Sequence, residues 1–262
     1  MKNNVLSAYQ RVRLARSEDR PRAKDYIEEL FDDIVYLNGD RHFGNSQSVI
    51  GGIASFQNQP VTFIGIQKGR GIEEAVMTDF GMPKPEGYRK AMRLMESAAK
   101  FGRPVITFVD TPGAYPGVDA EERGQSEAIA SSLALMSGLE VPVIAFIIGE
   151  GGSGGALALS VANRLYMLEN AVFSILSPEG FASILWKDSS LASDAAELMK
   201  LTAFDLKEAG IIDGIIKEEQ HVSLPALEGM KATLTKDLKQ LKSKKGSVLR
   251  DERYDKFRAI GG

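Results

Sequence analysis

Two apolar segments, each followed by a glycine-rich turn, constrain the fold more than any other feature of the sequence. PVITFVD, residues 104–110, leads into TPGAYPG, and VPVIAFII, residues 141–148, leads into GEGGSGG. Near-continuous apolar runs of this length are typical of strands that are buried on both faces of a sheet. Such strands need helices to cover them, so the two segments predict an α/β fold.

The segments around these strands repeat an order of two strands followed by a helix. The apolar pattern predicts a strand pair over 48–56 and 60–66, joined across residues 58–60, and a second pair over 164–169 and 171–176. Helices are expected over the ranges 88–101, 121–136 and 178–186. The sheet is therefore expected to consist of strand–strand–helix units.

Both ends of the chain are expected to be helical. Apolar residues from Tyr26 to Val35 recur at helical spacing, which predicts a helix that begins at Asp25 and ends at Gly39. Near the C-terminus one helical face is apolar, with Leu227, Met230, Leu234, Leu238 and Leu241. Because no linker divides the chain, we expect a single domain with three parts: an N-terminal helical segment over 1–40, a ββα core over 45–220 and a C-terminal helical tail over 225–262.

The composition excludes several classes of protein. With 32 basic and 35 acidic residues the net charge is -3, so no nucleic-acid partner is expected. The absence of cysteine excludes disulfides, thiolate nucleophiles and cysteine-based zinc sites, and two histidines are too few for a histidine cluster, so we expect no metal site. The chain shows no secretory signal pattern and its apolar runs are too short to cross a bilayer. We therefore expect a cytoplasmic protein without membrane contact.

Basic residues cluster at the two ends of this acidic chain. Six of them lie between Arg11 and Lys24, where a solvated helical face is the default interpretation and a surface for phosphates or an acidic partner is the alternative. Lys200 lies in LMKL, which resembles a biotin-attachment motif, but the surrounding pattern is helical, so we expect a surface lysine. Lys68 lies in GIQKGRG, which does not match a phosphate-binding P-loop.

The stretch IIGEGGSGGALAL, residues 147–159, fits a dinucleotide-binding fingerprint. Gly149, Gly151 and Gly154 spell G-x-G-x-x-G between a strand and a helix, and Glu169 follows about twenty residues on. Against this interpretation, such a fingerprint normally opens its domain. A purely structural glycine turn, packed tightly against a neighbouring helix, is the simplest alternative.

The same stretch also contains the G-x-S-x-G of a serine hydrolase in Gly151, Ser153 and Gly155. A nucleophilic Ser153 would need a histidine base, which the chain order assigns to His221. The acid between them would be one of Asp194, Asp205 and Asp213. His221 lies in a polar stretch shortly before Pro225 without a catalytic loop signature, which counts against the hypothesis.

A third interpretation uses only the backbone of this turn. Glycines let peptide N–H groups approach a ligand oxygen, and at a helix N-terminus these donors also favour negative charge. Together they predict an oxyanion hole formed by Gly151, Gly152, Gly154 and Gly155. The other turn can supply the amides of Gly113 and Ala114, although Pro112 and Pro116 also make it a plausible rigid connection.

Long blocks of the sequence resemble one family in particular. The chain is similar to the α-subunit family of bacterial acetyl-coenzyme A carboxylase carboxyltransferases, in its short form. The resemblance covers essentially the whole chain and rests on the blocks MTDFGMPKPEGYRKAMRLMESAAKFG, ITFVDTPGAYPGVDAEERGQSEAIA, IGEGGSGGALAL and SPEGFASILWKD.

The resemblance implies a fold, a reaction and a set of partners. The fold would be a crotonase-like ββα spiral with helical extensions. The chain would act with a zinc-ribbon β subunit in an α2β2 heterotetramer and transfer a carboxyl group from carboxybiotin to acetyl-coenzyme A, giving malonyl-coenzyme A for fatty acid biosynthesis. The biotin carboxyl carrier protein would deliver carboxybiotin. ATP would be used by a different component of the wider complex, which also contains biotin carboxylase.

The resemblance also assigns the glycine turn to catalysis. Its pattern places the ureido oxygen of biotin against the amides of Gly154 and Gly155, so Ser153 would not be a nucleophile. A valine at Gly155 is expected to block this contact and to leave the fold intact. A non-catalytic scaffold that only binds the carrier is the alternative from another class, although a scaffold would not need four glycines at this turn.

Overall fold

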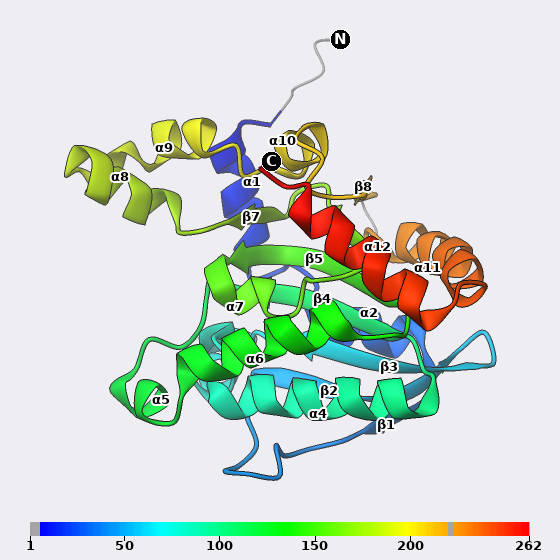
Figure 1. The fold of residues 1–262 in the computed structure, drawn as a ribbon. Coiled ribbons are helices and arrows are strands. Elements are labelled where there is room, and N and C mark those ends of the chain that lie inside the picture. Colours follow the sequence, from blue (N-terminus) through cyan, green and yellow to red (C-terminus); the bar gives the residue numbers. More distant parts are fainter. Residues whose placement is uncertain (1–5, 220–222, 262) are drawn as a thin grey trace.

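The computed structural model describes residues 6–219 and 223–261. In this part of the chain the strands are β1 (Asp32–Tyr36), β2 (Val49–Phe56), β3 (Gln59–Ile66), β4 (Val105–Thr111), β5 (Val143–Gly152), β6 (Arg164–Leu168), β7 (Val172–Ser174) and β8 (Gly214–Ile216). They form one eight-stranded sheet in the order β1-β2-β3-β4-β5-β6-β8, and β7 pairs with β5 (Figure 1). The β1–β2 and β2–β3 pairs are antiparallel, and the others are parallel.

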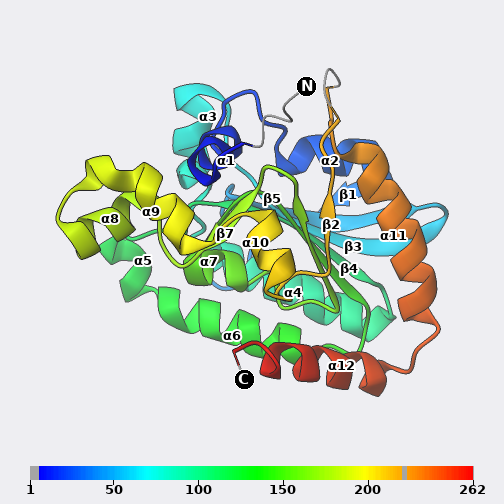
Figure 2. The same cartoon turned by 90° about the horizontal axis from the view of Figure 1, so that it is seen from above.

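Helices lie on both sides of this sheet. They are α1 (Ala8–Ala15), α2 (Ala23–Leu30), α3 (Gly71–Met77), α4 (Pro85–Phe101), α5 (Val118–Glu122), α6 (Gln125–Gly138), α7 (Ser153–Leu157), α8 (Pro178–Trp186), α9 (Ala192–Met199), α10 (Ala203–Glu208), α11 (Leu227–Lys242) and α12 (Gly246–Arg258), with short 3-10 turns η1 (Asp79–Gly81) and η2 (Ser189–Leu191). The α4 and α6 helices pack together on one side, and α2 lies on the other. Figure 2 shows α12 alongside α6, and the α8–α9 pair at the opposite end of the molecule from α11.

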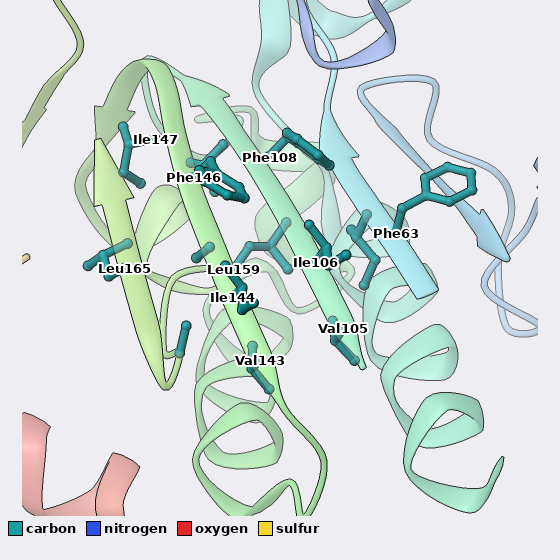
Figure 3. Close-up of a cluster of buried hydrophobic side chains, with 14 of the residues drawn as sticks. Phe63, Val105, Ile106, Phe108, Val143, Ile144, Phe146, Ile147, Leu159 and Leu165 are labelled. Carbon is teal, nitrogen blue, oxygen red and sulfur yellow. The ribbon is translucent and has the colours of Figure 1, made fainter. Parts of the chain in front are cut away.

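The two apolar segments form adjacent central strands, as the sequence predicts for buried strands. Every residue of β4 is buried, and β4 pairs in parallel with β5. Figure 3 shows the side chains of these strands packed into one cluster, in which the rings of Phe108 and Phe146 stack with centroids 5.8 Å apart. Each large apolar side chain buried in this way contributes about 1.5–3 kcal/mol. The α/β prediction is confirmed.

The helix predicted from Asp25 to Gly39 is wrong in its second half. The α2 helix ends at Leu30, and Phe31 is already extended, with φ -121° and ψ 147°. Its ring packs against Phe63 and Phe108 with centroids about 6 Å away. Residues 32–36 then form β1, which pairs with the otherwise free edge of β2. Tertiary packing and edge pairing therefore override the helical spacing here.

Two further predictions need correction. The helix expected over 121–136 is divided into α5 and α6 at Gly124, whose φ of 84° lies in the left-handed region. The strands expected as a pair over 164–169 and 171–176 do not pair with each other, because β6 and β7 both pair in parallel with β5. In contrast, the β2–β3 hairpin forms as predicted.

The C-terminal helices are attached to the core by apolar and polar contacts. The predicted apolar face of α11 is buried at Met230, Leu234, Leu238 and Leu241. From α12, the buried guanidinium of Arg253 donates hydrogen bonds to several oxygen atoms, namely Met136 O at 2.7 Å, Leu139 O at 2.9 Å, Val141 O at 3.1 Å and Asn163 Oδ1 at 2.7 Å. Burial lowers the pKa of Arg253 to about 10. Arg253 therefore caps the C-terminal end of α6.

Candidate functional site

The two glycine-rich turns meet at one edge of the sheet. Since β4 and β5 are adjacent and parallel, their carboxyl ends lie side by side, which is the edge where ligands bind in open α/β sheets. A Cβ on Gly152 would lie 2.1 Å from the carbonyl oxygen of Pro112, and a Cβ on Gly155 would lie 2.6 Å from the amide nitrogen of Ala114. Only glycine allows this backbone-to-backbone contact without a shift. The structure thus brings the residues selected at both turns together.

Gly155 is therefore more constrained than the sequence suggests. A valine at this position would collide with backbone atoms of the neighbouring turn rather than only with a ligand. The expectation that such a variant keeps an intact fold is wrong. Gly154 differs, because a Cβ there would meet only Ile129 Cγ2 at an ordinary contact distance of 3.6 Å.

The amides of the α7 first turn are available as hydrogen-bond donors. Gly152 is the N-cap of α7, so the N–H groups of Gly154 and Gly155 precede the first intrahelical bond. Ser153 has a φ of 53°, which bends the chain sharply between β5 and α7. In the other turn, the Gly113 amide donates to Thr111 Oγ1 at 3.0 Å and is already satisfied. The amides best placed to bind a ligand are therefore those in the first turn of α7, and the amide of Gly113 is less available.

An apolar cavity of about 450 Å³ opens beside Gly154. Its walls include Ser153, Gly154, Leu157, Phe173, Phe181 and Met199. A Cβ on Gly151 would lie 2.7 Å from the Phe173 ring, so this glycine lets Phe173 approach the turn. A mostly apolar cavity with a few backbone donors at its edge suits a flat ring with one polar side.

Sequence reasoning missed an ion cluster beneath the turns, formed by Arg16, Arg22, Lys68, Asp110 and Glu150. The ammonium of Lys68 lies 2.7 Å from Asp110 and 2.8 Å from Glu150. Arg22 contacts Asp110 at 3.3 Å, and Arg16 contacts Glu150 at 2.7 Å. The signal available in the sequence was a charged residue near the carboxyl end of each of three strands, which parallel pairing of β3, β4 and β5 brings together.

The carboxyl group of Asp110 is fully enclosed. Burial alone would raise its pKa, but the charge and hydrogen bond of Lys68, the Glu150 amide at 2.9 Å and Arg22 hold the pKa below its usual value. Asp110 is therefore ionised at neutral pH. Because Asp110 directly precedes one turn and Glu150 lies at the start of the other, the ion cluster links the two turns.

Three arginines of the basic N-terminal segment are not a solvated or phosphate-binding surface. Arg11, Arg20 and Arg22 are buried. Arg20 donates to the carbonyl oxygen of Ile148 at 2.6 Å and pairs with Glu218 at 3.0 Å. Both interpretations of the charge run are wrong for these residues, because they attach the N-terminal segment to the sheet. Lys200, in contrast, is exposed as expected and follows the end of α9.

The hydrolase hypothesis gains no support. Ser153 is exposed, but His221 lies outside the described residues. Asp205 and Thr202 form the capping box at the start of α10. The carboxylate of Asp213 accepts a hydrogen bond from the Leu165 amide at 2.7 Å. These two acids therefore have structural roles, and Asp194 lies exposed on α9. The dinucleotide hypothesis is weakened in the same way. The Glu169 carboxylate that it requires accepts a hydrogen bond from the Glu218 amide and so has a structural role.

Replacing Ser153 by alanine is expected to leave most activity intact, because the backbone interpretation uses the amides of this turn and not its side chains. Ser153→Gly is the matched control, since glycine suits the φ of 53° and should keep or raise stability. Steady-state kinetics and thermal unfolding would measure both effects. A loss of about a thousandfold or more would indicate a nucleophile instead.

The family model described as "Acetyl co-enzyme A carboxylase carboxyltransferase-like" matches residues 2–261. The chain belongs to this family. A protein of Streptococcus pyogenes serotype M5 (strain Manfredo), named acetyl-coenzyme A carboxylase carboxyl transferase subunit alpha, is 56% identical over 244 residues, which cover 93% of this chain and 95% of that protein. The resemblance recognised in the sequence is thereby confirmed.

Solved structures of this family's wider fold superpose on the chain. Transcarboxylase 12S, with methylmalonyl-coenzyme A bound, matches with a TM-score of 0.71 at 20% identity, covering 93% of this chain and 46% of that chain. A Pseudomonas malonate decarboxylase hetero-tetramer in complex with coenzyme A matches with a TM-score of 0.65 at 17% identity, covering 76% of this chain and 82% of that chain. The predicted crotonase-like fold is confirmed.

Two structural findings concern metals and membranes. Among residues 6–219 and 223–261, no group of three or more histidine, cysteine, aspartate or glutamate side chains is arranged to hold a metal ion. Within the same residues, every helix is too short or too polar to span a bilayer.

Proposed function

We propose that the chain is the α subunit of the carboxyltransferase component of acetyl-coenzyme A carboxylase and transfers a carboxyl group from carboxybiotin to acetyl-coenzyme A. Two lines of support combine. The family assignment covers nearly the whole chain, and 56% identity joins it to a relative named as this subunit. The observation that carries the chemistry is the contact between two glycine turns at the carboxyl ends of β4 and β5. A carrier-binding scaffold would not require this contact.

The catalytic role belongs to the amides of Gly154 and Gly155. Carboxybiotin supplies the carboxyl group, and its ureido oxygen gains negative charge as that group leaves. The two amides lie in the first turn of α7, where the helix dipole adds to their attraction for an anion. Each preorganised donor of this kind is worth about 3–4 kcal/mol in the transition state.

The remaining residues of the site form its binding surface. The apolar cavity beside Gly154 fits the bicyclic ring of biotin, since its walls are mainly apolar and aromatic. Gly151 and Gly152 permit the close approach of Phe173 and Pro112, and Gly113 with Ala114 forms the opposite turn. The proposed cofactor-binding residues are thus Gly113, Ala114, Gly151 and Gly152.

The partners follow from the same assignment. We infer an α2β2 assembly with a zinc-ribbon β subunit that holds acetyl-coenzyme A, together with the biotin carboxyl carrier protein and, for the ATP-dependent step, biotin carboxylase. Supporting features are the exposed apolar side chains Ile184, Leu185 and Leu198 on α8 and α9, which suit a protein partner. A cytoplasmic location and a role in fatty acid biosynthesis accompany this proposal.

The isolated chain is expected to be inactive and to gain activity with the β subunit. The reason is that its oxyanion amides serve one of the two reacting carbonyl groups, and a second set must hold the thioester. The test mixes the purified chain with its β subunit, carboxylated carrier and acetyl-coenzyme A, and measures malonyl-coenzyme A. The β subunit alone is the control. Carboxyl transfer by this chain alone at the rate of the mixture would contradict the proposal.

A further inference from the structure

One buried hydroxyl group at the seam between the two turns has no hydrogen-bond partner. Tyr88 lies in the first turns of α4 and is fully buried, and its Oη has no partner in the described part of the chain. Its ring packs in a small apolar cluster with Ala114, Ala128, Ile129 and Ala158, separate from the main core. This cluster lies directly against the residues that form the site.

The position of the hydroxyl oxygen is defined by Gly155. A Cβ on Gly155 would lie 2.9 Å from Tyr88 Oη, 2.6 Å from the amide nitrogen of Ala114 and 2.8 Å from the carbonyl carbon of Gly113. The hydroxyl therefore lies where α7 meets the turn after β4. Burial raises the pKa of Tyr88 above its usual value, so the hydroxyl is protonated and can act as a donor at neutral pH.

An unpartnered buried hydroxyl is unfavourable for the fold, and phenylalanine would fill the same space without it. The turn beside the hydroxyl packs tightly against α7 on one side but has open space on the other, because a Cβ built on Gly113 has no atom within 4 Å and Gly113 is partly exposed. A small shift of this turn on ligand binding would give the hydroxyl a backbone partner. In that state it would hold the turn against α7.

We propose that Tyr88 is a positioning residue of the oxyanion site, whose hydroxyl gains its hydrogen bond in the ligand-bound state and thereby fixes the Gly113–Ala114 turn relative to the Gly155 amide. The inference rests on the proposed function. It assigns to Tyr88 an effect on the rate of transfer rather than on folding or on the binding of acetyl-coenzyme A.

The test is the Tyr88→Phe variant, assembled with the β subunit and assayed with carboxylated carrier. We expect kcat to fall by about tenfold to a hundredfold, within the range that one misplaced group at such a site causes. The KM for acetyl-coenzyme A should stay unchanged, and the Tm should be equal to or above that of the wild type.

Tyr26→Phe is the matched control. Tyr26 is also fully buried, its hydroxyl is also unpartnered among the described residues, and burial raises its pKa too, but it belongs to the main core. This variant should keep the wild-type kcat. The inference is overturned if Tyr88→Phe stays within twofold of the wild type, or if its kcat falls only in step with a lower Tm. If the wild-type assembly itself transfers no carboxyl group, the proposed function fails instead.

Discussion

Replacing Gly155 by alanine is expected to lower kcat for carboxyl transfer by about a hundredfold, the loss that a misplacement of about 1 Å causes at a catalytic site. The added methyl group would lie 2.6 Å from the Ala114 nitrogen and 2.8 Å from the Gly113 carbonyl carbon, so the two turns must separate. Because the backbone has to move, the Tm should fall as well. Steady-state kinetics of the assembled enzyme and thermal unfolding of the chain would measure both effects.

Gly154→Ala is the control for this experiment. It makes the same chemical change one residue earlier in the same helix, where the methyl group would meet only Ile129 at 3.6 Å. Its amide N–H is retained, so we expect wild-type stability and a kcat within about tenfold of wild type. Equal losses in the two variants would show that the contact between the turns does not govern activity.

Replacing Lys68 by methionine is expected to destabilise the protein by about 3–5 kcal/mol, the usual cost of removing one partner from a buried ion pair. Its ammonium lies between Asp110 and Glu150, and the side chain of Asp110 is only 1% exposed. Without Lys68, the two carboxylates repel each other directly below the turns. Activity should fall together with stability, because both turns begin at these residues.

The loss should depend on pH in a defined direction. In the wild type, the lowered pKa of Asp110 contributes stability above the unfolded-state value of about 3.9 and loses it as the pH falls through the folded-state value. In Lys68→Met, burial is less opposed, so the pKa of Asp110 is higher than in the wild type and the ionised carboxylate contributes less stability. The difference in unfolding free energy should therefore be fully present near neutral pH and should narrow as the pH falls through the folded-state pKa values of Asp110 in the two proteins.

Urea unfolding at several pH values would measure this difference. The control is Lys24→Met, since Lys24 is an exposed lysine that lies 3.6 Å from Glu28 on α2. A surface pair of this kind contributes at most about 1 kcal/mol. If Lys68→Met proves as mild as Lys24→Met at pH 7, the ion cluster does not hold the turns.

The central strands and the turn residues are predictable because their signals are local. Apolar runs mark β4 and β5, and glycines mark positions where a side chain would collide. The β1 strand is less predictable, because apolar residues from Tyr26 to Val35 fit helical spacing across a boundary that packing of Phe31 decides. The partner of a strand is also decided by residues far away in the sequence. The sequence therefore suggested that the neighbouring strands β6 and β7 pair with each other, whereas both pair with β5.

The charged residues of the site show the same limit. A run of arginines looks solvated, since its partners are far away in the sequence: Glu218 for Arg20, and Asp110 for Arg22. Tyr88 is harder still to identify, because its special feature is a missing partner. No residue pattern reports an unmade hydrogen bond, and only the packed structure reveals it.

Arg253 has a consequence for how the protein is made. It donates hydrogen bonds to carbonyl oxygens at the end of α6 and to Asn163 beside β6, although these residues precede it by 90 to 117 positions in the sequence. Chains emerge from the ribosome N-terminus first, so the preceding segments can begin to fold during synthesis. The end of α6, however, waits for a residue that is synthesised 117 positions after Met136. This part of the fold can therefore be completed only after α12 has been synthesised.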